Sequence, residues 1–171
     1  MTTDDLNIFE CNSYYQGYID KAKDLDFIHG FKISLEETEN LLKDLNEEKL
    51  LYRYKPEKWT IKEILQHLMD TERIFAYRAL RIAREDKTPM PGFEQDDYIL
   101  PSKANGREID VMLKEYETVR NATISLFNSF PSETYTNKGI ASNSDISVRA
   151  LGFMIIGHER HHCEIIRQRY L

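Results

Sequence analysis

Four long segments of the chain repeat apolar residues every three or four positions, which is the spacing of one face of an α-helix. We expect these amphipathic helices near residues 34–46, 60–85, 105–128 and 144–169. Alternation typical of β-strands is scarce, and no repeat of solenoid length is visible. Helices with apolar stripes can bury those stripes by packing against one another. The sequence therefore predicts an all-α fold, a four-helix bundle formed by residues 1–171 as one domain.

Two of the expected helices begin with a capping pattern. Ser34 is followed three residues later by Glu37, and Thr60 is followed by Glu63, so each pair can form a capping box. Trp59 directly precedes the second of these caps. We expect its indole to pack as a hydrophobic staple rather than to stack on a substrate.

The connections between the helices differ in length. Those near residues 85–105 and 128–144 are longer than a tight antiparallel turn needs, so we expect at least one crossover connection. Residues 89–98 combine two prolines with aromatic and acidic side chains, and we expect them to form a lid over an open end of the bundle. A short helix in the tyrosine-rich segment before Ser34 would close one end.

The charge balance of the chain is acidic, with a formal net charge of −6, and no run of Lys and Arg forms a basic stripe. This disfavours a nucleic-acid partner. The first thirty residues lack the basic and apolar regions of a signal peptide, and no apolar stretch approaches the ~20 residues of a membrane span. We therefore expect a cytoplasmic protein without a membrane partner. A homodimer is compatible with these features, which do not decide for or against it.

The chain has only two cysteines, Cys11 and Cys163, which are too few for a disulfide framework and fit a reducing compartment. Cys163 directly follows His162, and consecutive residues point about 100° apart around a helix. We therefore expect Cys163 to be a small buried hydrophobic residue rather than a thiolate ligand.

The histidines form the most specific chemical pattern. His158 and His162 lie four residues apart on the apolar stripe of the last helix, so both rings occupy one helix face and can bind the same metal ion. His67, on the flank of the second helix's stripe, is the candidate for a third ligand. His161 points elsewhere on the last helix, and His29 is expected in a surface loop. The alternative is that the buried imidazoles are satisfied by a carboxylate or by water.

Charged and polar residues near these histidines allow two interpretations. Asp70 and Thr71 follow His67 by about one turn and can orient its imidazole, and Glu159 lies beside His158. For both carboxylates we favour a solvated or helix-pairing charge. An anion-binding face is one interpretation of the arginines of the second helix, although solvated charge is favoured for them as well: Arg73, Arg78, Arg81 and Arg84.

Three stretches of the chain resemble the DinB-like superfamily. They are Trp59–Arg73, which contains His67, then Phe75–Arg84, and finally Gly157–His162. The resemblance extends from about Tyr14 to Tyr170, and the histidine motifs occur in the family's order. It implies an up-up-down-down four-helix bundle that holds a divalent ion, commonly nickel or zinc, with metal ligands at His67, His158 and His162. Relatives include metal-dependent hydrolases and thiol-dependent S-transferases or isomerases that use a low-molecular-weight thiol.

These observations favour a metal-dependent enzyme, either a thiol S-transferase or a hydrolase, that acts on a small-molecule substrate through an open coordination position. Two alternatives remain. One is a non-catalytic metal-binding bundle that acts through a protein partner, for example in a stress response. The other is a helical protein whose histidines pair with carboxylates. If three imidazoles bind the ion, metal affinity is expected to fall as the pH drops through about 6.5.

Overall fold

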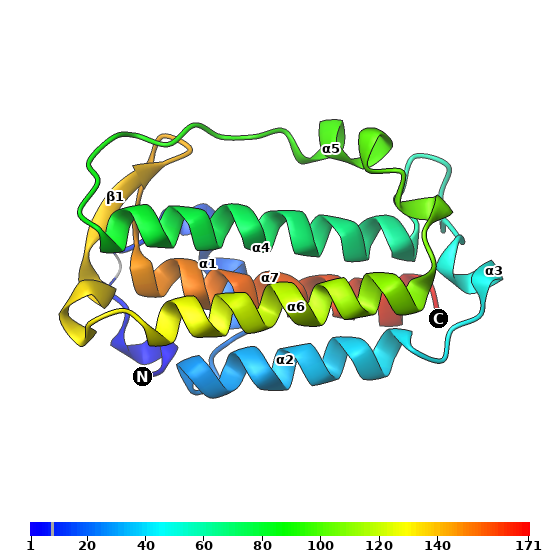
Figure 1. Ribbon diagram of the computed structural model, residues 1–171, viewed down its shortest axis with the longest axis horizontal. Helices are drawn as coiled ribbons and strands as arrows, with labels where there is room; N and C mark the ends of the chain where they lie inside the picture. Colours follow the sequence, from blue (N-terminus) through cyan, green and yellow to red (C-terminus); the bar gives the residue numbers. More distant parts are fainter. Residues whose placement is uncertain (8) are drawn as a thin grey trace.

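The computed structural model describes residues 1–7 and 9–171. Four long helices lie side by side along the molecule (Figure 1). They are α2 (Phe27–Leu42), α4 (Ile61–Ala83), α6 (Ile109–Asn128) and α7 (Val148–Arg169). The predicted all-α four-helix bundle is confirmed.

Short elements connect and close the bundle. The short α-helices are α1 (Gln16–Asp20), α3 (Glu47–Leu50) and α5 (Gln95–Ser102). Single 3₁₀ turns occur at Thr3–Asp5, Ser13–Tyr15, Ala104–Gly106 and Ser132–Thr136. A two-stranded antiparallel hairpin consists of β1 (Lys138–Ala141) and β2 (Ser144–Ser147).

The directions of the four helices differ from the expected up-up-down-down order. If α2 runs up, α4 and α6 run down and α7 runs up again (Figure 1). Side-chain contacts agree with the picture. Thr38 of α2 bonds Glu159 of α7 in a parallel pair, whereas His67, in the N-terminal half of α4, packs against His162, in the C-terminal half of α7. An up-up-down-down bundle needs two crossovers. Here one long connection, residues 84–108, crosses over along the bundle.

The first long helix begins earlier than predicted. Asp26 is its N-cap, with a side-chain oxygen that accepts a hydrogen bond from the His29 backbone amide, and Ser34 lies in the helix interior. The predicted capping box at Ser34 and Glu37 is therefore wrong. The Ser34 hydroxyl instead accepts a hydrogen bond from buried Arg120. Ser34 is therefore polar because it bonds Arg120 and not because it begins a helix.

The capping box of α4 is confirmed. The Thr60 hydroxyl accepts a bond from the Glu63 amide, and the Glu63 carboxylate accepts one from the Thr60 amide. The last helix, by contrast, begins at Val148 with Ser147 as N-cap, rather than near residue 144.

A hairpin occupies residues 138–147, and the sequence analysis missed it. Its two-residue turn, Ser142 and Asn143, has positive φ at both positions (52° and 61°), as a tight turn that matches strand twist requires. Each strand has only four residues, which is too short for alternation of polar and apolar residues to stand out.

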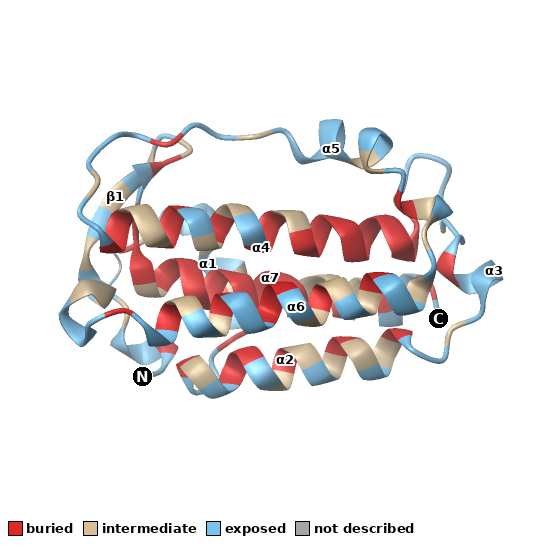
Figure 2. Cartoon of the chain, in the orientation of Figure 1, coloured by how far each residue is buried: buried red, intermediate tan, exposed pale blue. Residues whose placement is uncertain are grey.

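The core consists of two apolar clusters, and buried residues concentrate in α4 and α7 (Figure 2). One cluster lies toward the hairpin and includes Phe27, Phe127 and Phe153. The other lies toward α3 and includes Leu42 and Tyr116. Buried polar residues from all four long helices lie between the two clusters. In sequence order they are Ser34, Thr38, His67, Thr71, Glu72, Arg120, Thr123, His158 and Glu159. The bundle therefore has a polar layer at mid-height.

Within the described part of the chain, no helix has both the length and the apolar character needed to cross a bilayer.

Candidate metal centre

The structure brings the three predicted histidines together. His67 comes from α4, and His158 and His162 come from adjacent turns of α7, which runs antiparallel to α4. The Nε2 atom of His158 lies 3.0 Å from Nε2 of His67 and 3.1 Å from Nε2 of His162. All three ligand atoms lie within 4.8 Å of one another. Three ring nitrogens therefore converge on one point.

This arrangement fits a metal ion better than a set of hydrogen bonds. Nitrogen atoms about 2.0–2.1 Å from one ion, in tetrahedral or octahedral geometry, are separated by about 2.9–3.4 Å. An imidazole nitrogen carries either one hydrogen or one lone pair, so Nε2 of His158 cannot form good hydrogen bonds to two other nitrogens. Three converging lone pairs repel one another unless a cation lies between them. The donor set is therefore suited to a divalent transition metal.

Burial keeps the three imidazoles neutral. It lowers the pKa of His67 to about 4, because few polar groups replace water around the ring. Burial also holds the pKa values of His158 and His162 well below the ordinary value, and charge on the neighbouring histidines would lower them further. Metal binding requires a nitrogen without a hydrogen, and each neutral ring has one such nitrogen at neutral pH.

Neighbouring side chains fix the rings. The Thr71 hydroxyl lies 3.3 Å from Nδ1 of His67, one turn along α4, as the sequence analysis suggested. The Trp59 ring packs at 4.7 Å from the His67 ring and stacks at 6.3 Å over His162, so this indole forms a wall of the centre as well as part of the core. On the other side, the Tyr18 ring makes an edge contact with His158 at 5.3 Å.

Gly157 allows this Tyr18 contact. A Cβ atom at position 157 would clash with the backbone carbonyl of Tyr18, so α1 can approach α7 this closely only at glycine. The residue before His158 is thus small because the backbone of α1 lies against it. The predicted short helix before Ser34 is present, but its expected place at one end of the bundle is wrong, because α1 lies against the middle of α7 beside the histidine centre.

The two neighbouring carboxylates behave differently from each other. Asp70 accepts a hydrogen bond from Gln66 and lies 3.6 Å from Arg73, so its interpretation as a helix-pairing charge is confirmed. The same interpretation is wrong for Glu159, which is 2% exposed. Its carboxylate accepts hydrogen bonds from Arg120 at 2.7 Å and from the Thr38 hydroxyl at 2.6 Å.

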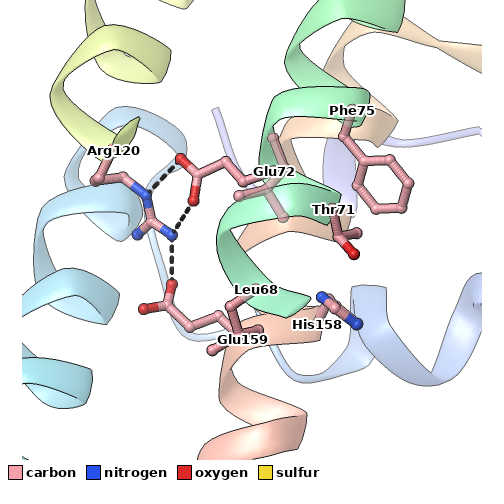
Figure 3. Close-up of a pocket in the computed structure, with 8 residues that line it drawn as sticks. Leu68, Thr71, Glu72, Phe75, Arg120, His158 and Glu159 are labelled. Atoms are coloured by element: carbon pink, nitrogen blue, oxygen red, sulfur yellow. Dashed lines mark hydrogen bonds and ion pairs between the residues drawn. The ribbon is translucent and has the colours of Figure 1, made fainter. Parts of the chain in front are cut away.

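Arg120 is the centre of a buried charge cluster that lies near His158 (Figure 3). Its guanidinium bonds both oxygens of Glu72 at 2.9 Å as well as Glu159, so one cation serves two carboxylates. Burial, with the charge of nearby Glu72, raises the pKa of Glu159 to about 8. Figure 3 shows His158 and Glu159 directed to different sides of α7. Sequence reasoning missed this cluster, although Arg120 and Glu72 lie close to apolar stripes.

The remaining candidate ligands lie outside the centre. His29 is exposed, as expected, but it belongs to α2 rather than to a loop. The ring of His161 contacts Tyr18 at 5.3 Å and is not one of the three converging ligands. Cys163 is buried and its sulfur lies 3.2 Å from the Thr38 hydroxyl, while burial raises the pKa of its thiol to about 11. Its prediction as a small buried residue is confirmed.

Two clefts border the histidine centre, one at His158 and the other at His162. A cleft of about 250 Å³ includes His158, Thr71 and Arg78 in its lining. A second cleft, of about 310 Å³, includes His162 and Trp59. Gln95, at the start of α5, lines both. The long connection that contains α5 runs along the outside of α4 (Figure 1). Part of the segment predicted as a lid therefore borders both entrances.

The chain thus forms a four-helix bundle with three histidines converging at mid-height, and the comparisons identify its family. Residues 31–166 match the model of the DinB superfamily, and the chain belongs to that family. It is 26% identical over 125 residues to the "putative metal-dependent hydrolase OB0413" of Oceanobacillus iheyensis, covering 72% of this chain and 71% of that protein.

A solved structure also resembles the bundle. YfiT from Bacillus subtilis, described as "a probable metal-dependent hydrolase with an unusual four-helix bundle topology", superposes with a TM-score of 0.74 at 12% sequence identity. The match covers 83% of this chain and 85% of YfiT. At this identity the likeness concerns the fold.

Proposed function

We propose that the protein binds one divalent transition metal, nickel or zinc, through His67, His158 and His162, and that it is a metal-dependent enzyme acting on a small molecule. The observation that carries the proposal is the convergence of three neutral Nε2 atoms, with Nε2 of His158 3.0 and 3.1 Å from the other two. The description of two similar proteins as metal-dependent hydrolases supports it.

Three imidazoles would leave an open position on the ion, which then supplies a Lewis acid that binds water or a thiolate. The chain's own residues prepare that position. Burial keeps the imidazole of His67 neutral, so one of its nitrogens is free to bind an ion, and Thr71 holds the ring through Nδ1. Trp59 and Tyr18 cover the rings on two sides and limit access of bulk water to them.

Hydrolysis and transfer to a low-molecular-weight thiol both follow from this site. The names of the similar proteins favour hydrolysis. The two clefts favour transfer, because a substrate can approach past His158 while a thiol approaches past His162. A single-turnover assay with and without added thiol separates the two reactions. Turnover that requires the thiol indicates transfer, whereas turnover in water alone indicates hydrolysis.

The competing role is a metal-binding bundle that acts only through a protein partner. An exchangeable coordination position distinguishes it from an enzyme. We expect the absorption bands of the cobalt-substituted protein to shift when azide or a small thiol is added, with saturation near one equivalent of bound ligand. A spectrum that no small ligand changes would indicate a closed coordination sphere and would contradict the enzymatic proposal.

A further inference from the structure

Arg78 is a buried arginine without a carboxylate partner. Arg78 is only 5% exposed, yet no Asp or Glu among the described residues lies within ion-pair distance of it. Buried charges are normally paired because desolvation of an isolated ion is costly. The other fully buried arginine, Arg120, has two carboxylates. Arg78 is therefore a cation whose counter-charge is missing from the described chain.

Hydrogen bonds use only part of the Arg78 guanidinium. Its Nη2 atom donates to the Pro91 carbonyl at 2.8 Å and to the Ser142 hydroxyl at 3.1 Å. Its Nε and Nη1 groups donate to no described residue. A guanidinium has five N–H donors in a planar fork that fits a carboxylate. Three of these donors, one on Nε and two on Nη1, remain for a ligand.

The other arginines of α4 do not share this environment. Arg73 is paired with Glu115 and Asp70, and Arg81 is paired with Asp86. Arg84 is exposed and lies over the Phe130 ring. The anion-binding face considered from the sequence is therefore not formed by the four residues together. Only Arg78 turns into the interior.

Arg78 and the histidine centre line the same cleft. Residues 67, 71, 75 and 78 follow one another at steps of four, four and three along α4, so they form one stripe of the helix. Thr71, Phe75, Arg78 and His158 all line the cleft of about 250 Å³. The one carboxylate in its lining, Glu94, is exposed and forms no ion pair with Arg78. The cleft thus has a metal-centre residue at one end and an unpaired cation at the other.

The walls between these two ends are mainly aromatic. Tyr15, Tyr18, Phe75 and Phe93 contribute to the lining. The Arg78 guanidinium lies 5.8 Å from the ring centroids of both Phe75 and Phe93, which hold its plane in place from two sides. A ligand that reaches from the histidines to Arg78 therefore passes these aromatic rings as well as polar groups of the lining.

We propose that Arg78 binds the carboxylate of an elongated substrate with an aromatic or apolar body, and so fixes the reactive group of that substrate at the His158 side of the metal centre. The inference rests on the proposed function for the role of the metal, but the anion site itself does not require the ion. The Arg78 guanidinium carbon lies 5.8 Å and the His158 ring centroid 6.4 Å from the Phe75 ring centroid, so the two groups are at most about 12 Å apart, and this separation limits the length of the substrate.

The side-chain Nε–H resonance of Arg78 tests the proposal by NMR. It is assigned by its absence from Arg78→Gln, and the protein is titrated with acetate, phosphate, phenylacetate, 4-phenylbutyrate and neutral 4-phenylbutyramide. We expect 4-phenylbutyrate to shift the resonance saturably. It should bind about tenfold or more tightly than the amide. Its binding to Arg78→Gln, followed by backbone amide shifts of neighbouring residues, should be weaker by a similar factor. A resonance that no carboxylate moves at about 10 mM would overturn the proposal. A response to phosphate alone would also overturn it.

Matched variants separate the anion site from other roles of Arg78. Arg84→Gln removes the same charge from an exposed position of the same helix and should leave binding unchanged. Ser142→Gly removes one bond that ties Arg78 to the hairpin and suits the positive φ there, so binding should persist. Loss of binding in either variant would contradict the assignment.

The test also distinguishes the anion site from the proposed function. His162→Ala should lose metal and still bind 4-phenylbutyrate, because Arg78 lies away from the ligand nitrogens. If the wild-type protein binds the carboxylate and no metal, the proposed function fails while the Arg78 site stands. If it binds metal and no carboxylate, the opposite conclusion follows.

Discussion

The Arg120 guanidinium lies 2.7 Å from the Glu159 carboxylate inside the bundle, and Glu159 is the next residue after His158. Arg120 also bonds Glu72 of α4 and the Ser34 hydroxyl of α2. A single side chain from α6 thus connects all three other long helices at the level of the histidines. We infer that this cluster fixes the rotation of α4 and α7 on which the convergence of the imidazoles depends.

Arg120→Met should be strongly destabilising. The change leaves the buried acidic side chains of Glu72 and Glu159 without their cationic partner, and breaking a buried pair costs about 3–5 kcal/mol of unfolding free energy. Urea denaturation of the metal-free protein at pH 7 measures the loss. Arg73→Met, which breaks an exposed pair, is the matched control and should cost under about 1 kcal/mol. Equal losses in the two variants would show that the buried cluster has no special role.

The metal-free protein should lose stability as the pH falls from 6.5 to 4. The folded-state pKa of His67 is about 4, below its ordinary value, so the unfolded chain binds the proton first. The stability that the buried neutral His67 ring contributes is therefore complete above pH 6.5 and is lost as the pH falls toward 4. For His67 alone it amounts to roughly 3 kcal/mol. Urea midpoints of the wild type and His67→Gln across this range give the difference, which should shrink toward acid pH. A difference independent of pH would contradict a buried neutral His67.

The same shift changes the expected pH dependence of metal binding. The sequence analysis placed the loss of affinity near pH 6.5, the value for solvated imidazole. Because burial holds all three pKa values lower, protons compete with the metal only in more acidic solution. Affinity should therefore change little between pH 8 and 6 and fall below about pH 5.

Gly157→Ala should displace α1 from α7. The new Cβ would occupy the position of the Tyr18 carbonyl, so the contact between Tyr18 and His158 cannot be kept. We expect a loss of about 1–3 kcal/mol in stability and weaker metal binding, measured by urea denaturation and by metal titration. Gly17→Ala meets no atom within 4 Å and serves as the control. Unchanged metal affinity in Gly157→Ala would show that α1 has no part in the centre.

Trp59 should report the metal directly. It is the single tryptophan of the chain, and its ring lies 4.7 Å from the His67 ring and 6.3 Å from the His162 ring. Nickel bound at the histidines should quench its fluorescence strongly, with an end point at one equivalent, whereas zinc should quench far less. His161→Ala should quench as the wild type does. Quenching that persists in His67→Ala would place the nickel elsewhere.

Much of the site could be predicted because its chemistry is local. His158 and His162 are four residues apart on one helix, and this spacing fixes their relation before any tertiary structure is known. The capping box at Thr60 is equally local. The position of His67 beside an apolar stripe made it a candidate, and the resemblance to a family supported it, since its approach to α7 depends on how two distant helices pack.

The features that sequence reasoning missed depend on long-range packing. Ser34 resembles a helix start, but its hydroxyl serves Arg120 from the interior of α2. Glu159 resembles a surface charge, and its partners Arg120 and Thr38 lie 39 and 121 residues away in the chain. The helix directions depend on which connection crosses over, and connection lengths alone do not specify that. The homodimer and the thiol cofactor stay predictions.

The metal content of the purified protein tests the central claim most directly. Protein prepared without a chelator or a histidine tag, and then incubated with nickel or zinc and desalted, is analysed for bound elements beside His67→Ala, His162→Ala and the control His161→Ala. The three-histidine centre predicts about one equivalent of metal in the wild type and in His161→Ala, and almost none in the other two variants, with helical content near native in all four. Wild-type protein that retains no metal, or ligand variants that retain it fully, would contradict the account.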